Sequence, residues 1–310
     1  MSKSIDLIAL GEPMVEFNQT HPNEPTYLQG FGGDTSNAVI AAARAGVRSA
    51  YLTRLGADHF GDALVALWDK EGVDSQAVER DPTSATGIYF VHHGKSGHVF
   101  SYMRAGSAAS RMTPAHLASQ GWNEAIARSK ILHVSGISLA ISPSACDTAL
   151  QAMRQAREAQ TLVSFDSNLR LKLWSLTQAQ AGIEQAVALC DLFLPSLEDM
   201  ETLTGLHDPD AIVDWSHAKG ARQVVLKLGE QGALVSDGQQ RHRVEGRRVP
   251  LVDATGAGDC FCGNLLARVA MGDDLFAATR YANQAAALSV QGFGAVAPLP
   301  TQAQVLAALG

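Results

Sequence analysis

The chain is poor in the residues that mark several protein classes. Among its 310 residues are only four cysteines, and aromatic residues make up 6%. Two of the cysteines, Cys260 and Cys262, are two apart on an expected helix, so they point to different faces and are poorly placed to share a metal ion. We therefore expect reduced thiols in a cytoplasmic protein, with no disulfide framework and no zinc site.

An excess of positive charge and a long apolar run are also lacking. The formal net charge is −7 at pH 7, which argues against a nucleic-acid partner because contact with phosphate backbones needs a basic face. No run of about 18 apolar residues occurs, so we expect no membrane span. The first residues contain no basic segment followed by an apolar one, so we expect no signal peptide. With 46% hydrophobic and 18% charged residues, the composition is that of a soluble globular protein.

What the sequence does contain is an alternation of short apolar runs and helical segments. Strands are expected at Ile5–Leu10, Ser49–Leu55, Ile131–Val134, Leu162–Asp166, Leu192–Leu194, Val224–Leu228 and Ala233–Ser236. Helices are expected at Thr35–Ala45, from about residue 59 to 70, and at Pro143–Glu158, Thr177–Leu189, Glu198–Thr204, Gly258–Met271 and Asp274–Gln291. Such alternation predicts a mostly parallel sheet covered by helices on both faces, with ligands beyond the carboxyl ends of its strands.

One region breaks this alternation and predicts a second, smaller sheet. The segments Thr86–His93 and His98–Arg104 look like two strands around a turn at Gly94–Gly97, and further strands are expected from about residue 15 to residue 29. A hairpin in an otherwise alternating chain usually belongs to a separate sheet. We therefore interpret residues 15–30 and 86–104 as a β lid over the main sheet.

Three side chains on the expected lid are candidates for ligand binding. Tyr102 and Arg104 are two apart on a strand and so point the same way, and Tyr89 lies on the partner strand. Arginine pairs with a carboxylate in a planar, two-pronged geometry, so this group would suit a polyol that carries an acid. A solvated sheet edge explains the same residues equally well.

A glycine-rich turn near the end of the chain is the strongest signal for chemistry. In Gly256-Ala257-Gly258-Asp259 the glycines leave the backbone open to a ligand, and a helix begins here, so its free N–H groups favour an anion such as phosphate. A carboxylate beside a bound phosphate is repelled unless it takes up a proton or holds a metal. Asp259 is therefore predicted to be the base for a hydroxyl nucleophile. Capping of the helix is the alternative.

Three other polar segments lie next to expected strands or helix starts. Within residues 32–37, Asp34 occupies the expected N-cap position and shares a helix face with Asn37, which suits sugar hydroxyls or simply caps the helix. The loop at 166–170, Asp-Ser-Asn-Leu-Arg, follows a strand and is either a ligand loop or a chance polar loop. Residues 227–232 link two strands, and taken alone they favour a plain β-turn.

These segments, in this order, resemble the signatures of the ribokinase-like carbohydrate kinases (the PfkB family). Residues 253–259 are similar to the family's C-terminal signature, residues 32–37 to its N-terminal glycine pair, and residues 227–232 fall where the family has its nucleotide-side loop. The resemblance runs from about Ile5 to Leu299. It implies a ribokinase-like three-layer α/β/α fold with a mostly parallel central sheet and a small β lid, in one domain over residues 1–310.

Within that family the chain most resembles the kinases of 2-keto-3-deoxygluconate, also called 2-dehydro-3-deoxygluconate. The resemblance rests on Asp34 after the glycine pair, on the lid residues, and on the arginine loop followed by Leu173 and Trp174. It implies transfer of a phosphoryl group from ATP, with Mg²⁺, to O6 of this sugar acid, with Asp259 as the base. Fructokinases share a similar arginine loop, so a fructokinase-type or other sugar or nucleoside kinase stays open. A sugar- or nucleotide-binding sensor without turnover is a third possibility.

The resemblance also implies a role for each candidate residue. The N–H groups of Gly256, Ala257 and Gly258 would hold the charge that develops on the moving phosphoryl group. The sugar would contact Gly33, Asp34, Asn37, Tyr89, Tyr102, Arg104, Arg170 and Asp259, with the arginines on its carboxylate or on phosphates. The nucleotide would contact Asn168, Ser196, Lys227, Gly229, Gly232, Gly256, Gly258 and Asn283.

The chain departs from the family pattern at one motif. Many members carry Asn-x-x-Glu, which organises Mg²⁺ and phosphate, and this chain has Ser196 and Asp199 at those two positions. Asp199 keeps a carboxylate, so metal binding through water is expected there. Some relatives also need a monovalent cation near the turn after Gly292, a point that the sequence leaves open. The exposed edges of the lid predict a homo-oligomer that pairs through it.

Overall fold

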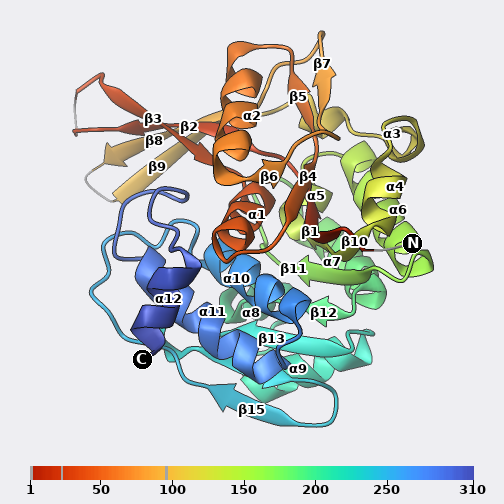
Figure 1. Ribbon diagram of the computed structural model, residues 1–310, viewed down its shortest axis with the longest axis vertical. Coiled ribbons are helices and arrows are strands. Elements are labelled where there is room, and N and C mark those ends of the chain that lie inside the picture. The colour runs from red at the N-terminus through yellow and green to blue at the C-terminus, as the bar shows by residue number, and fades with distance from the viewer. Residues whose placement is uncertain (1–2, 22–23, 95–96) are drawn as a thin grey trace.

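A sheet of nine strands forms the middle of three layers in this computed structural model, which describes residues 3–21, 24–94 and 97–310 (Figure 1). In spatial order its strands are Arg241–Val244 (β15), Ala233–Ser236 (β14), Gln223–Lys227 (β13), Leu192–Phe193 (β12), Leu162–Asp166 (β11), Ser129–Ser135 (β10), Ile5–Leu10 (β1), Ser49–Leu52 (β4) and Val73–Asp74 (β6). Neighbouring strands run parallel from β13 to β6, and only β14 and β15 pair antiparallel. The predicted mostly parallel sheet is confirmed.

Helices cover both faces of this sheet, because each carries one apolar side that must be buried. One face packs against Asp34–Arg44 (α1), His59–Glu71 (α2), Ala257–Met271 (α10), Leu275–Ser289 (α11) and Gln302–Leu309 (α12). The other packs against Pro114–Ser119 (α3), Trp122–Ala127 (α4), Gly136–Ala140 (α5), Pro143–Glu158 (α6), Leu176–Leu189 (α7), Leu197–Thr204 (α8) and Pro209–Ala218 (α9). No helix within the described ranges is long and apolar enough to cross a membrane.

The expected strand Ser49–Leu55 is wrong in its length. The main-sheet strand ends at Leu52, and Arg54–Gly56 (β5) pairs instead with Glu79–Asp81 (β7) in a separate two-stranded sheet. Thr53 separates the two strands, and its hydroxyl donates to the carbonyl of Gly11. Periodicity alone did not reveal this break, because apolar, buried Leu52 and Leu55 lie close on either side of it.

The predicted lid sheet is present and projects from the main body (Figure 1). Its strands are, in spatial order, Tyr27–Gly32 (β3), Met14–Gln19 (β2), Ile88–Gly94 (β8) and Gly97–Met103 (β9). Residues 22–23 of the expected lid, and Lys95 and Ser96 in the expected turn, lie outside the described residues. Aromatic rings hold the sheet together, among them Phe17 against Phe90, with ring centroids 5.2 Å apart.

Helix α1 begins one residue earlier than the sequence suggests. Gly33, not Asp34, is its N-cap, and Asp34 already lies in the first turn. Gly33 has φ = 109°, and a Cβ there would lie 2.6 Å from the carbonyl oxygen of Glu12, so the position requires glycine. The carboxyl group of Asp34 therefore does not cap the helix and can bind a more distant partner.

Candidate active site

The first turns of α1 and α10 meet at the carboxyl edge of the sheet. Asn37 of α1 donates from Nδ2 to Oδ2 of Asp259 on α10 across 2.8 Å. The helices can approach this closely because α10 carries Gly263, where a Cβ would lie 2.1 Å from the carbonyl oxygen of Ala38. Two signatures more than 200 residues apart are thus joined through the predicted base.

The surroundings of Asp259 favour its protonated form. Burial raises its pKa from 3.8 to about 7, and the nearby carboxyl of Asp34 adds to this effect. The hydrogen bond from Asn37 and the charge of Lys227 oppose it. A carboxyl that titrates near neutral pH can accept a proton from a hydroxyl and release it again, which is what a general base requires.

The glycine-rich turn presents its amides at the start of α10. Gly256 is the N-cap, with φ = 73°, and it packs against Ala295. The N–H of Ala257 already donates to the carbonyl of Ala254 at 3.1 Å, so of the three predicted amide donors, those of Gly256 and Gly258 are the better placed to bind an anion. The macrodipole of α10 adds positive potential at the same place.

Asp253 fastens this turn to the loop that follows α11. Its Oδ1 accepts from the backbone N–H and the hydroxyl of Thr255, and its Oδ2 accepts from the N–H of Gly294. The sequence alone predicted no role for Asp253. Its contacts make the shape of the glycine-rich turn depend on the loop at 290–298.

Two residues predicted for different ligands contact each other. Asn168, expected on the nucleotide, donates from Nδ2 to Oδ2 of Asp34, expected on the sugar, at 2.8 Å. Asn168 has φ = 26°, a left-handed conformation that asparagine tolerates better than most residues. The polar loop is thereby joined to α1. Burial and the charge of Asp166 raise the pKa of Asp34, whereas the hydrogen bonds that its carboxyl accepts lower it.

Lys227 lies at the end of β13, where it forms an ion pair inside the site. Its Nζ lies 2.9 Å from each carboxylate oxygen of Asp166, at the end of β11. Both side chains are almost inaccessible to solvent, at 13% and 5% exposed. Burial alone would lower the pKa of Lys227, but Asp166 and the neighbouring Cys262 raise it above its usual range, so the ammonium stays charged.

The predicted nucleotide-binding residues Gly229, Gly232 and Asn283 lie where the turn at 229–232 packs closely against the segment after β15. A Cβ on Gly232 would lie 2.1 Å from the carbonyl oxygen of Val244, so glycine is needed for the turn at 229–232 to approach the segment after β15. Asn283 of α11 donates from Nδ2 to the carbonyls of Val244 and Glu245. Gly229 faces open space, where a flat ring could lie against the backbone.

Two of the three predicted lid residues already have acidic partners. Tyr89 is buried and donates its hydroxyl to Glu16. Arg104 donates through Nε and Nη2 to one oxygen of Glu12, whose other oxygen accepts from Ser107. Burial of Tyr89 raises its pKa, so its hydroxyl keeps its proton. Tyr89 and Arg104 therefore have only part of their hydrogen-bonding capacity available to a ligand, and their contact with a sugar stays a prediction.

Tyr102 and Arg170 remain the most accessible of the predicted sugar-binding side chains. Tyr102 is 44% exposed, and its ring stacks on that of Tyr89 at 5.7 Å. Arg170 is exposed and forms no ion pair among the described residues; its Nη1 donates only to the carbonyl of Leu169. Its charge reaches Asp34, whose pKa it lowers.

The two residues that depart from the family motif stabilise local structure. Ser196 is the N-cap of α8, and its hydroxyl accepts from the N–H of Asp199. Oδ2 of Asp199 accepts from the hydroxyl of Ser167 at 2.7 Å. In the part of the chain that the structure describes, no three His, Cys, Asp or Glu side chains form a ready-made metal site.

Glu12, Glu16 and Asp166 are the charged site residues that sequence reasoning did not assign. Glu12 and Asp166 each lie at the carboxyl end of a sheet strand, where ligands of such folds bind, so strand position alone could have singled them out. Glu16 lies on a lid strand and offered no such signal.

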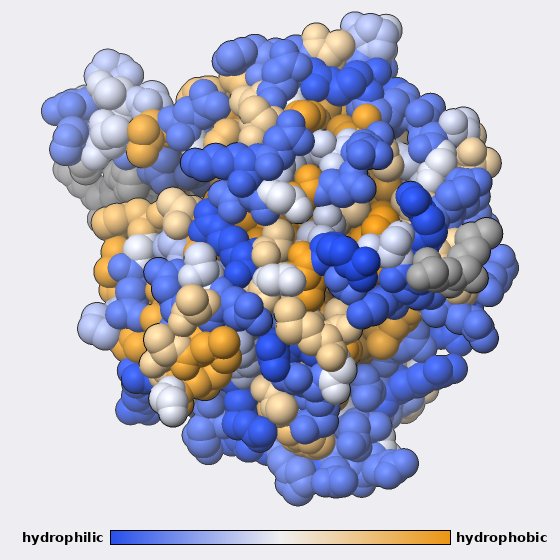
Figure 2. All heavy atoms as spheres, viewed as in Figure 1, coloured by the Kyte–Doolittle hydropathy of each residue, from blue (hydrophilic) through white to orange (hydrophobic). Residues whose placement is uncertain are grey.

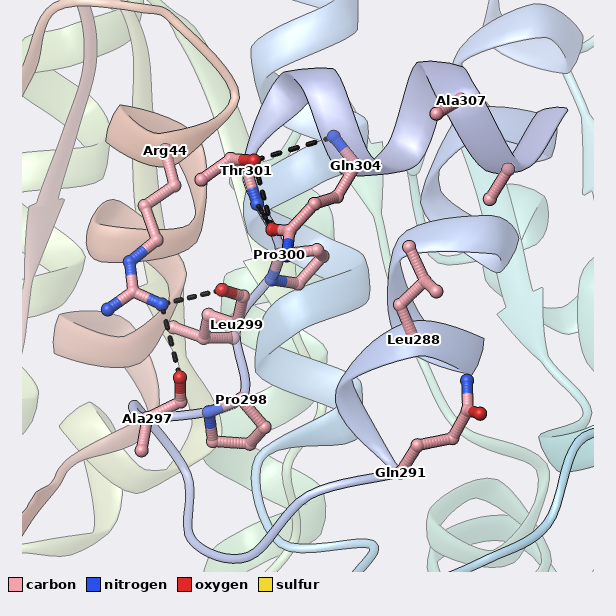
Figure 3. A pocket seen from close by; sticks show the side chains of 11 residues that line it. Arg44, Leu288, Gln291, Ala297, Pro298, Leu299, Pro300, Thr301, Gln304 and Ala307 are labelled. Carbon is pink, nitrogen blue, oxygen red and sulfur yellow. Dashed lines mark hydrogen bonds between the residues drawn. The ribbon is translucent and has the colours of Figure 1, made fainter. Parts of the chain in front are cut away.

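A hollow of about 740 Å³ lies away from these residues, beside the loop at 297–301. Figure 3 shows Arg44 of α1 reaching toward Ala297 and Leu299, whose carbonyls accept from its Nη1. Leu288 of α11 lies on the opposite wall. An apolar patch covers α12 in Figure 2, where Leu306 and Leu309 are about half exposed. The hollow contains none of the predicted site residues, so it is distinct from the candidate active site.

The contacts around Asp259 suit one kind of reaction. A helix start that binds phosphate and a carboxyl that accepts a proton are the parts needed to move a phosphoryl group onto a hydroxyl. Fold and site together define a phosphotransferase with a hydroxyl acceptor. The chain belongs to the pfkB family of carbohydrate kinases, which it matches over residues 2–302.

Individual relatives carry two different names at nearly equal identity. A 2-dehydro-3-deoxygluconokinase from Thermoproteus tenax is 33% identical, over 97% of this chain and 94% of its own. A fructokinase from Solanum habrochaites is 31% identical, over 98% and 95%. The crystal structure of a fructokinase from Vibrio cholerae O395, with fructose, ADP and calcium ion bound, has a TM-score of 0.87 at 32% identity and covers 99% of this chain and 100% of its own. These matches confirm the predicted fold class and leave the sugar unsettled.

The raised pKa of Asp259 predicts an unusual dependence of stability on pH. Between 3.8 and about 7 the folded chain keeps a proton that the unfolded chain has released, so the free energy of unfolding should fall as pH rises through this range. Asp259→Asn removes that loss and keeps an acceptor for Asn37. In urea unfolding at pH 8 we expect the variant to be more stable than the wild type by about 1–3 kcal/mol, with a smaller difference at pH 5. A variant that is less stable at both pH values would contradict the assignment.

Proposed function

We propose that the chain transfers the γ-phosphoryl group of ATP to O6 of 2-keto-3-deoxygluconate, with Asp259 as the base. The observation that carries the transfer is the hydrogen bond from Asn37 to a carboxyl that titrates near pH 7 beside the glycine-rich turn. The observation that favours an acid substrate is the guanidinium of Arg170, which has no acidic partner among the described residues. Residues 1–310 act in this proposal as one kinase domain whose lid sheet covers the sugar.

The step itself needs few groups. Asp259 accepts the proton of the sugar hydroxyl, the hydroxyl oxygen forms a bond to the γ-phosphorus, and the bond from that phosphorus to the bridging oxygen breaks to release ADP. The amides of Gly256 and Gly258 stabilise the charge on the moving group. Mg²⁺ would be held mainly by the phosphates of ATP, because it prefers few protein carboxylates and several waters. Asp199 would be the carboxylate available to it through water.

The nucleotide and the sugar approach Asp259 from opposite sides. The nucleotide lies along Gly229, Gly232 and Asn283, and Ser196 and Asn168 border its phosphates. The sugar hydroxyls contact the first turn of α1, where Asn37 has a buried Oδ1 without a partner among the described residues. A buried acceptor of this kind is costly unless a ligand supplies the missing hydrogen, which supports a hydroxyl-bearing substrate.

A fructokinase-type reaction is the second candidate, and one contact favours it. Glu12 compensates the charge of Arg104, so that arginine needs no carboxylate from the substrate. Of the two arginines predicted to bind the sugar, a neutral sugar would then leave Arg170 alone without an anionic partner. In the first candidate, Arg104 keeps Nη1 for the substrate, since only its Nε and Nη2 bind Glu12. A monovalent cation near the loop at 292–298 fits either reaction.

Substrate choice can be tested by measuring ADP release with 2-keto-3-deoxygluconate, fructose, ribose and a nucleoside. We expect kcat/KM to be highest for the sugar acid. Arg170→Ala and Arg104→Ala should each raise its KM about tenfold or more, the loss of one charged hydrogen bond, while the KM for ATP changes less than about threefold. Exposed Arg128, the C-cap of α4, provides Arg128→Ala as the control. A higher kcat/KM for fructose would instead support the second candidate.

We further propose that two copies of the chain pair through their lids. The outer strands of the lid sheet, β3 and β9, leave their edges open, and both carry exposed apolar side chains. Leu28 is 68% exposed and Met103 is 64% exposed. Open edges with apolar side chains are surfaces that proteins usually cover.

Light scattering after size-exclusion chromatography tests this pairing. The wild type should have about twice the chain mass of 32.8 kDa, and Leu28→Glu together with Met103→Glu should shift it to one chain mass. Leu306→Glu on α12, equally apolar and half exposed, should leave the mass unchanged. A wild type of one chain mass, or a dimer that survives both lid substitutions, would exclude the lid as the interface.

A further inference from the structure

Lys227, Asp166 and Cys262 form a buried cluster where three elements converge. The ammonium of Lys227 has three hydrogens to donate. Two are directed at the oxygens of Asp166, each 2.9 Å away, and the third at Sγ of Cys262, 3.6 Å away. The thiol in turn donates to Oδ2 of Asp166 at 3.3 Å.

The cluster lies against the start of α10. Nζ of Lys227 is 3.7 Å from the position that a Cβ on Gly258 would occupy, with no side chain between them. Its charge is felt at Asp259, where it lowers the pKa. The ammonium therefore lies beside the turn whose amides face the anion and within electrostatic reach of the base.

The buried ion pair of Lys227 and Asp166 holds a charge ready for a ligand and contributes little to the stability of the fold. Removing an ammonium and a carboxylate from water is expensive, and a buried ion pair often stabilises a fold no better than apolar residues of the same size. Neutral thiol sulfur is also a weak acceptor, and burial raises the pKa of Cys262 so that it stays neutral. The third hydrogen of Lys227 is thus free to move to a stronger acceptor, and a phosphate oxygen is one.

We propose that Lys227 is a catalytic residue that contacts the γ-phosphoryl group during transfer, and that Asp166 is the positioning residue that holds its ammonium at the Gly258 turn. The proposal rests on the kinase function proposed above. It identifies Lys227 as the positive charge that stabilises the transferred phosphoryl group. As the hydroxyl oxygen bonds to phosphorus and the bond to ADP breaks, negative charge spreads over the three outer oxygens. The third hydrogen of Lys227 then turns from the sulfur to one of them.

The two residues should act on the base with opposite signs. Asp166 raises the pKa of Asp259 and Lys227 lowers it. The other titratable groups that act on this site are Asp34, which also raises that pKa, and Tyr51, Tyr89 and Cys262, whose own pKa values are raised so that they stay neutral. Replacing Lys227 and replacing Asp166 should therefore move the acidic limb of the pH profile in opposite directions. A merely structural defect would not do so.

The experiment measures kcat, both KM values and the pH profile of kcat/KM for Lys227→Met, Asp166→Asn and the double variant, with the best sugar substrate and MgATP. We expect Lys227→Met to lower kcat about 10²–10³-fold, as for loss of one donor to a developing anion, with the sugar KM within about threefold. Its acidic limb should move to higher pH by about half a unit or more, and that of Asp166→Asn to lower pH by a similar amount. Lys219→Met is the matched control, because Lys219 forms an ion pair with Glu184 on the surface.

The double variant guards against misfolding, since it leaves no unpaired buried charge. It should fold and be as slow as Lys227→Met. A kcat within about threefold of the wild type in Lys227→Met or in the double variant, or acidic limbs that move the same way in both single variants, would overturn the proposal. A wild type without ADP release on any sugar would instead overturn the proposed kinase function, so the two failures are distinguishable.

Discussion

The hydrogen bond from Asn37 to Asp259 is the contact on which the rest of the site depends. It joins the first turns of α1 and α10 across 2.8 Å and so fixes the direction of the Asp259 carboxyl. Burial raises the pKa of this carboxyl to about 7. In the proposed reaction neither helix start suffices alone. The amides of α10 would bind the phosphate but provide no base with a defined orientation, and the polar turn of α1 would contact the sugar hydroxyls but offers no phosphate site. Close packing at Gly263 brings the two together.

Around this contact each of three carboxyl groups has a partner from another segment of the chain. The neutral amide of Asn168 donates to Asp34, the ammonium of Lys227 pairs with Asp166, and the guanidinium of Arg104 pairs with Glu12. Paired charges keep the site folded without ligand, because an uncompensated buried charge costs several kcal/mol. Arg170, which has no acidic partner among the described residues, is the group best suited to respond to a charged substrate.

Much of this could be predicted from the sequence, but only where the signal is local. The alternation of strands and helices, the lid hairpin and the position of Asp259 in a first helix turn all follow from short patterns of glycine and apolar residues. The helices α3, α4, α5, α9 and α12 were not anticipated, because each is only five to ten residues long and has few turns in which an apolar period can show. Nor was the end of β4 at Leu52, because a hydrogen bond from Thr53 to a distant carbonyl sets it.

The long-range pairings could not be predicted at all. That Arg104 is held by Glu12 depends on how the lid folds onto the segment after β1, and that Tyr89 is held by Glu16 depends on the pairing of β2 with β8. The same is true of Asn168, whose predicted place on the nucleotide did not suggest a partner on α1. Such contacts change what a predicted residue can offer a ligand: two of the five N–H donors of Arg104 already bind Glu12.

The turnover of Asp259→Asn tests the central claim most directly. With MgATP and the best sugar substrate at pH 8, the loss of the base should lower kcat by about 10²–10⁴-fold. The sugar should still bind, because asparagine preserves the shape of the side chain and its bond to Asn37. A kcat within about threefold of the wild type would show that Asp259 does not accept the proton, and the pairing of α1 with α10 would then need another explanation.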